Sequence, residues 1–158
     1  WAFDVLQECG ITYDSSVFPV HNYRYGIADA PRFAHEIQPG LMELPPSTWR
    51  VAGRNVPVAG GAYFRLLPYT LTRFGLRRVH AEGEPAVFYL HPWELDPDHP
   101  RLSLPRRVAL THYYNLSVTQ TRVRKLLAEF DFAPAGEVLA KYACDGRRAV
   151  GNTGRFSE

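Results

Sequence analysis

One junction restricts the fold of this chain more than any other: a helical pattern passes almost directly into a continuous apolar run. Residues 67–83, LPYTLTRFGLRRVHAEG, place apolar side chains at helical spacing, and Gly83 supplies a common helix end. The run AVFYL at 86–90 has no polar residue to mark a solvent-facing side. A strand that is apolar throughout is typical of a parallel sheet covered by helices on both faces. The junction therefore predicts an α/β fold.

The rest of the chain alternates in the same way between helical and extended patterns. WAFDVLQEC predicts a helix that Gly10 ends, and ITYDSSVF predicts a strand that ends near Asp14. Residues 19–40, with three prolines and two glycines, predict an irregular connection. Further strands are expected within 41–51, which Pro45 and Pro46 interrupt, and at 54–58; further helices are expected at 117–130 and at the end of 132–142.

The predicted helix at 117–130 has the clearest internal signals. Ser117 and Gln120 have the spacing of a capping box. The apolar stripe that we expect to be buried consists of Val123, Leu126, Leu127 and Phe130. Beyond Ala143 the sequence has no periodicity, so we expect one domain at 1–142 and a flexible tail at 143–158.

Composition limits the classes of function that this chain can have. Its 158 residues, 46% of them hydrophobic, suffice for one globular domain. Eighteen basic and sixteen acidic residues are too balanced to indicate a nucleic-acid or lipid-surface partner. No apolar run approaches the ~20 residues of a membrane span, and no signal peptide is visible, which gives the cytoplasm a small preference. Two cysteines, Cys9 and Cys144, are too few for a disulfide framework or a zinc cluster.

His91 stands where the apolar run ends, and Pro92 and Pro97 stiffen the segment that follows. In parallel α/β folds, the loops that leave the carboxyl ends of strands carry the functional side chains. His91 is therefore a candidate functional residue. The alternative is a structural histidine packed beside Trp93, and position alone favours neither.

Three segments match one family in order: WAFDVLQECGITYDSSVFP, NVPVAGGAYFRLLPYTLTRFGLRRV and FYLHPWELDP. They resemble the C-terminal half of NodB-homology polysaccharide deacetylases (carbohydrate esterase family 4), most of all the branch associated with bacterial exopolysaccharide loci of the exosortase/PEP-CTERM kind. The resemblance covers about residues 1–140. It implies the C-terminal part of a distorted (β/α) barrel with mostly parallel strands. The implied activity is metal-dependent hydrolysis of N-acetyl groups on a polysaccharide.

The same resemblance assigns two catalytic residues. His91 falls on the family's late LxH motif, with Tyr89 in place of the leucine, and the histidine of that motif protonates the leaving amine. Asp14 in TYDSS is matched by chain order to the acid that pairs with this histidine, although the usual Asp-Trp signature is absent. The alternative for Asp14 is an Asx-turn or helix cap shared with Ser15 and Ser16.

Three further residues are candidates for binding the sugar, since aromatic faces stack on sugar rings. Trp93 and Glu94 are expected to form one wall of a saccharide groove, and Tyr63 to line it. The alternatives are a loop anchored by a buried indole at Trp93 and, for the VAGGAY stretch at 58–63, simply a tight turn.

The family's metal ligands belong to motifs that precede the matched part: an aspartate of a TFDD-like strand and two histidines of an HSxxH-like motif. No two of the six histidines here are three or four residues apart, so none form a helix-borne ligand pair. The resemblance therefore implies a divalent metal, with zinc expected, whose ligands are not in this chain. We also expect self-association or a need for a missing N-terminal half. A non-catalytic carbohydrate-binding or scaffold fragment is the alternative function.

Overall fold

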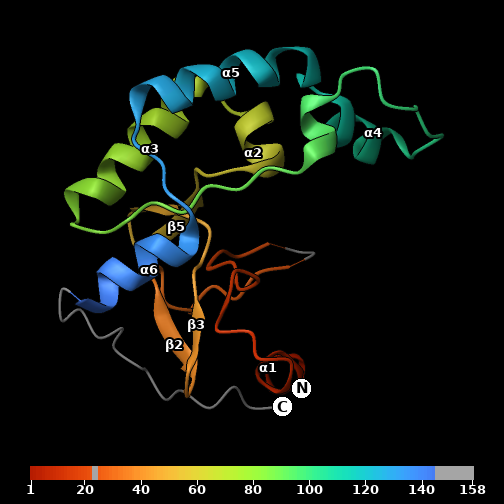
Figure 1. Cartoon of the computed structure of the whole chain (residues 1–158). Coiled ribbons are helices and arrows are strands. Elements are labelled where there is room, and N and C mark those ends of the chain that lie inside the picture. The colour runs from red at the N-terminus through yellow and green to blue at the C-terminus, as the bar shows by residue number, and fades with distance from the viewer. Residues whose placement is uncertain (23–24, 145–158) are drawn as a thin grey trace. The chain divides into compact units, whose positions relative to one another are not determined.

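The computed structural model describes residues 1–22 and 25–144, without the side chains of the last two (Figure 1). Most of the segment expected as a flexible tail, 145–158, lies outside the described residues. The chain divides into two compact units: Trp1–Pro45 together with Ala133–Glu158, and Pro46–Phe132. We call them the split unit and the central unit. The elements are mixed helices and small sheets, so the expected α/β class is confirmed, while a partial barrel stays a prediction.

The split unit contains a three-stranded sheet. Strand β3 pairs in parallel with β1 and antiparallel with β2. Two side-chain bonds tie the first helix to the β2–β3 hairpin: Gln7 Nε2 donates to the Pro39 carbonyl at 2.6 Å, and Gln38 Nε2 donates to Asp4 Oδ1 at 2.9 Å. The elements of this unit are α1 (Ala2–Glu8), β1 (Tyr13–Asp14), β2 (His35–Gln38), β3 (Leu41–Glu43) and α6 (Ala135–Cys144).

Two boundaries in the split unit test the sequence patterns. Helix α1 ends at Glu8, and Gly10 follows its C-cap in the left-handed conformation that the sequence predicts there: Gly10 has φ +74°, and the Ile11 N–H donates to the Leu6 carbonyl at 2.9 Å. Strand β2 lies inside the segment expected to be irregular. Its residues HEIQ carry a single large aliphatic side chain, so they lack a strand's pattern, and pairing with β3 supplies the strand instead.

In the central unit one long helix packs on an antiparallel hairpin, and a second long helix packs on the first. Leu76 and Leu126 are buried together at the contact of α3 and α5, which lie side by side in Figure 1. Helix α3 begins after Pro68 and is followed by Gly83 at φ +82°, as the sequence predicts. The elements are β4 (Thr48–Val51), β5 (Arg54–Pro57), α2 (Gly61–Leu66), α3 (Tyr69–Ala81), the 3-10 helix η1 (Pro92–Leu95), α4 (Arg106–Tyr113) and α5 (Leu116–Glu129).

The expected strand at 86–90 is wrong. The residues form a half-buried extended segment whose backbone groups bond irregularly rather than in a ladder. Ser47 N–H donates to the Val87 carbonyl at 3.0 Å, and Val87 N–H donates to Ser47 Oγ at 2.8 Å. Phe88 packs edge-on against Phe64 of α2, with ring centroids 4.9 Å apart. The run is therefore apolar because it packs against helices, and it does not lie inside a sheet.

The expected predominance of parallel strands is also wrong for the described residues. One strand pairing, β1 with β3, is parallel, while β2–β3 and β4–β5 are antiparallel. Both antiparallel pairs are hairpins with short turns, which sequence-adjacent strands form most readily. No closed barrel occurs in the described part of the chain.

Helix α5 differs from its expected pattern in how it begins and in which of its side chains are buried. It begins after Asn115, which has a left-handed φ of +58°, and no side-chain cap bond forms there, so the capping box is not made. Leu126 is 1% exposed, whereas Leu127 is 57% exposed. The buried side of the helix instead includes Thr119, because α5 packs against η1 and α2 and, through Leu126, against Leu76 of α3. Among the described helices, none has both the length and the apolar character needed to cross a membrane.

Candidate active site

His91 lies at the point where the extended segment turns into η1. Pro92 occupies the first position of this short helix, and the tight turn returns Glu94 to the imidazole. Nδ1 of His91 lies 2.9 Å from Oε1 of Glu94. Since an ionised carboxylate can only accept, Nδ1 carries the hydrogen and Nε2 is the free nitrogen of the neutral ring. The His91 side chain is 57% exposed while that of Glu94 is 1% exposed, so the imidazole bridges solvent and a buried carboxylate.

Arg65 holds the other side of that carboxylate. Its Nε donates to Oε2 of Glu94 at 3.1 Å, and both side chains are buried. Nη1 of the same guanidinium donates to three carbonyl oxygens at the end of α4: Thr111 at 3.0 Å, His112 at 2.8 Å and Tyr114 at 3.1 Å. Carbonyls at a helix C-terminus carry partial negative charge, so they suit a cation. The guanidinium thus joins α2, η1 and α4.

Two glycines position Arg65. Gly60 has φ +77°, and a Cβ placed on it would meet the Tyr89 carbonyl oxygen at 2.2 Å. Gly61, at φ +52°, lies under the Tyr89 ring, so no side chain fits at either residue without strain. Helix α2 begins here and carries Arg65 in its last turn. The tight turn in VAGGAY is confirmed, and a sugar-binding role for the half-buried Tyr63 stays a prediction.

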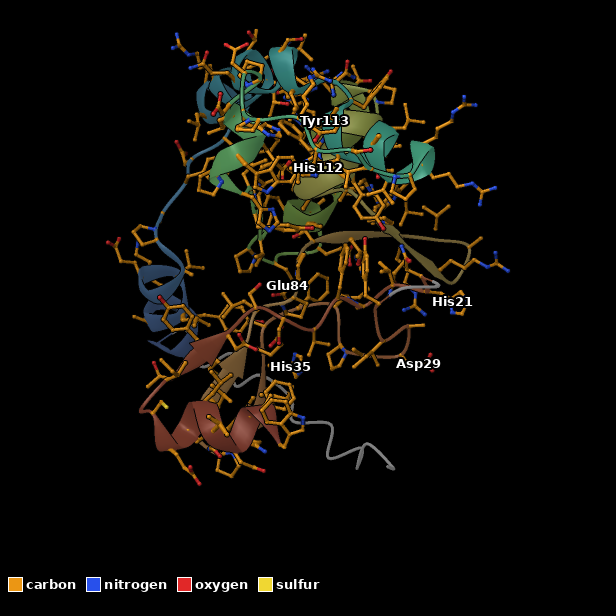
Figure 2. The ribbon with its side chains drawn as sticks, turned by 90° about the vertical axis from the view of Figure 1, so that its right-hand side faces the viewer. His21, Asp29, His35, Glu84, His112 and Tyr113 are labelled. Atoms are coloured by element: carbon orange, nitrogen blue, oxygen red, sulfur yellow. The ribbon has the colours of Figure 1, made fainter. Side chains whose placement is uncertain are left out.

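Aromatic rings surround the histidine. The Trp93 indole stacks on His112 with centroids 4.1 Å apart, and on His91 at 6.0 Å. Tyr89 meets the His91 ring edge-on at 5.7 Å. His112 and Tyr113 at the end of α4 are labelled in Figure 2. Trp93, which is half-buried, thus packs on His112 and also borders the exposed imidazole.

Burial lowers the pKa of His112, and the positive charges near it, of His99 and Arg65, lower it further. The neighbouring Glu94 acts in the opposite direction but more weakly. His112 therefore stacks on Trp93 as a neutral ring near pH 7, which avoids a second cation beside the buried guanidinium.

Asp14 lies in the split unit, whereas His91 lies in the central unit. Asp14 Oδ2 accepts a short hydrogen bond from Ser16 Oγ, a local contact between two side chains. Its pairing with His91 stays a prediction. Within the central unit, His91 contacts the carboxylate of Glu94, a residue that the sequence pattern assigns to the wall of a saccharide groove.

Arg65 was not recognised from the sequence. The sequence does contain a local signal for the contact between His91 and Glu94. The two residues are three positions apart, and the short turn that begins at Pro92 brings them together. Arg65 lies 29 residues before Glu94, and no local pattern links the two. Within the described ranges no three His, Cys, Asp or Glu side chains gather in a way that could hold a metal ion.

A family model for a domain of unknown function, DUF3473, matches residues 15–140. The match includes Arg65, His91, Trp93, Glu94 and His112, and it begins one residue after Asp14. No curated protein matches the chain. No solved structure matches it either.

Proposed function

We propose that this chain, which belongs to the DUF3473 family, a domain of unknown function, is the C-terminal portion of a metal-dependent polysaccharide N-deacetylase of the NodB-homology kind. The substrate class is a bacterial exopolysaccharide that carries N-acetyl groups. We base this on the resemblance of three ordered segments, and one observation supports it most: the exposed imidazole of His91 is bonded to a buried, ion-paired carboxylate. A histidine held in this way is suited to proton transfer.

Hydrolysis of an amide requires a proton for the amine, which otherwise leaves poorly. In this proposal the His91 imidazolium donates that proton from Nε2, the nitrogen that faces away from Glu94. Water adds to the acetyl carbonyl carbon, and the C–N bond of this adduct then breaks: its electron pair takes the proton from Nε2, acetate and the free amine are released, and the ring becomes neutral while Nδ1–H stays bonded to Oε1. Glu94 acts on the substrate only through His91, because its two carboxylate oxygens are engaged by His91 and Arg65.

The aromatic border of His91 fits a saccharide. Trp93 and Tyr89 flank the imidazole at 6.0 Å and 5.7 Å between ring centroids. A sugar whose acetamido group reaches Nε2 would pass these rings, and aromatic surfaces suit the apolar faces of sugar rings. Trp93 is therefore retained as a proposed substrate-binding residue, and Tyr63 is retained on the sequence analysis alone.

The described residues do not provide a site for the divalent metal that the resemblance implies. The resemblance assigns the metal ligands to motifs that precede the matched segments, and on that basis we propose that zinc or a similar ion is held there; we derive no step through it. Asp14 is retained as a proposed second acidic partner of the site.

The test uses the gene product that contains this chain, assayed for acetate released from an N-acetylated polysaccharide. His91→Ala should lower kcat by ~10²–10⁴, the usual contribution of a positioned general acid, without changing metal content. His80→Ala, an exposed histidine of α3, is the matched control and should leave kcat unchanged. Activity of His91→Ala within a few-fold of wild type would refute the proposal. Sugar binding by a wild-type protein that releases no acetate would favour the carbohydrate-binding alternative.

A further inference from the structure

We propose that Arg65 is a positioning residue: it fixes the carboxylate of Glu94 so that His91 keeps one orientation and presents Nε2 outward. The catalytic meaning of this orientation rests on the proposed function. The contacts themselves, from Arg65 through Glu94 to His91, can be tested on the chain without any substrate.

The first step is that Arg65 is anchored independently of Glu94. Its Nη1 is bonded to three carbonyls of the α4 end, and its own carbonyl accepts hydrogen bonds from Asn115 Nδ2 at 2.8 Å and Arg122 Nη1 at 3.2 Å. Both the side chain and the backbone of this residue are therefore held by α4 and α5. The guanidinium carbon of Arg65 also lies over the Trp93 ring, 5.0 Å from the ring centroid.

The second step is that Glu94 divides its oxygens between two partners. Oε2 accepts from the anchored Arg65 and Oε1 faces His91, so the guanidinium sets where the second oxygen lies. A buried carboxylate without a cation is strongly disfavoured, which ties Glu94 to Arg65 rather than to solvent.

The third step concerns His91, whose ring is more than half exposed. An exposed imidazole samples several rotamers unless a specific bond selects one, and a misplaced general acid loses much of its effect. The bond from Nδ1 to Oε1 is the polar contact that selects the rotamer, and Arg65 holds its acceptor in place. Lysine could keep the charge at residue 65 but cannot reach Oε2 and the α4 carbonyls with one fixed fork.

The test is NMR of the imidazole N–H groups of the 158-residue chain, with the His91 signal assigned by its absence in His91→Gln. In wild type we expect a hydrogen-bonded Nδ1–H on His91. In Arg65→Lys its exchange with solvent should accelerate at least about tenfold, because a hydrogen bond to a charged group contributes more than the ~1.4 kcal/mol that a factor of ten represents. Arg73→Lys is the matched control: Arg73 of α3 also pairs with a glutamate, Glu129, at 3.6 Å between Nη1 and Oε2. This control should leave the His91 signal unchanged, and equal effects of the two variants would overturn the proposal.

Glu94→Asp keeps the buried ion pair but shortens the carboxylate by one methylene, so it tests the same idea if Arg65→Lys does not fold. Because Arg65 is anchored elsewhere, the shorter side chain should stay with the guanidinium. We then expect the Arg65 Nε–H signal to persist and the His91 Nδ1–H signal to be lost. The reverse pattern, or persistence of both signals, would show that Arg65 does not position the carboxylate.

An activity measurement separates this inference from the proposed function. In the gene product that contains this chain, Arg65→Lys should lower kcat with little change in KM and should move the basic limb of the pH–rate profile to lower pH, as expected when the general acid loses its fixed partner. Loss of the NMR signature in a protein without deacetylase activity supports the positioning role and refutes the function. If the enzyme is active, and Arg65→Lys changes neither the His91 NMR signal nor the pH–rate profile, the proposed function is supported and the positioning role is refuted.

Discussion

The buried carboxyl of Glu43 should make the stability of this protein depend on pH between about 4.5 and 7. Glu43 on β3 has 0% exposure, and its Oε1 accepts the Val17 N–H at 2.9 Å. Burial raises the pKa of Glu43 from 4.5 to about 7. The Val17 hydrogen bond opposes that rise, while the charge of Asp14, its partner across the β1–β3 pairing, adds to it.

The sign follows from proton binding. Folded protein holds a proton on Glu43 more tightly than unfolded chain does, so protonation favours folding. The contribution of protonated Glu43 to the free energy of unfolding is therefore fully present below pH 4.5 and is lost as the pH rises to about 7. A rise of about 2.5 in the pKa corresponds to ~3 kcal/mol, since each pKa unit represents ~1.4 kcal/mol. That is a large part of the ~5–15 kcal/mol that stabilises an ordinary domain.

Glu43→Gln keeps the side-chain shape and removes the charge. We expect the variant to match wild type near pH 4.5 and to exceed it by up to ~3 kcal/mol at pH 8. The measurement is urea unfolding from pH 4.5 to 8, followed through NMR signals of the split unit, because Glu43 belongs to that unit. Glu8→Gln, on the exposed face of α1, is the control and should retain the wild-type slope. If Glu43→Gln keeps that slope too, or is less stable than wild type at pH 8, the reasoning is wrong.

The remaining predictions concern the central unit. Leu126→Ala should cost ~2–5 kcal/mol in urea unfolding, while Leu127→Ala, on the exposed face of the same helix, should cost about 0.5 or less; equal costs would contradict the orientation of α5. Gly60→Ala should be several-fold more destabilising than Gly53→Ala, which has a similar φ but open space around it, because the new Cβ at residue 60 would meet a carbonyl oxygen at 2.2 Å. NMR titration should place the pKa of His112 below the usual 6.5 for histidine, and a value above it would mean that the stack on Trp93 is not formed.

Local sequence patterns determined those elements whose ends depend on a few neighbouring residues. Gly10 ends α1 because a left-handed residue is needed there, and Pro68 and Gly83 frame α3 for equally local reasons. The choice of His91 as a candidate functional residue also followed from its neighbours, since an ionisable residue ends an apolar run. Pro92 directly after His91 and Glu94 three residues on are visible in the sequence, but the sequence does not show that Glu94 contacts the imidazole.

Tertiary packing decided the rest. Residues 86–90 are apolar because they lie against helices, and periodicity cannot distinguish that burial from a place inside a sheet. Leu127 has the spacing of a buried residue, but the rotation of α5 against its neighbours leaves it exposed. The site depends on an ion pair between residues 29 positions apart and on carbonyls 46 to 49 positions from Arg65. Such partners are selected by charge burial in the folded protein, where an unpaired guanidinium or carboxylate is too unfavourable to persist, and no spacing rule along the chain encodes that choice.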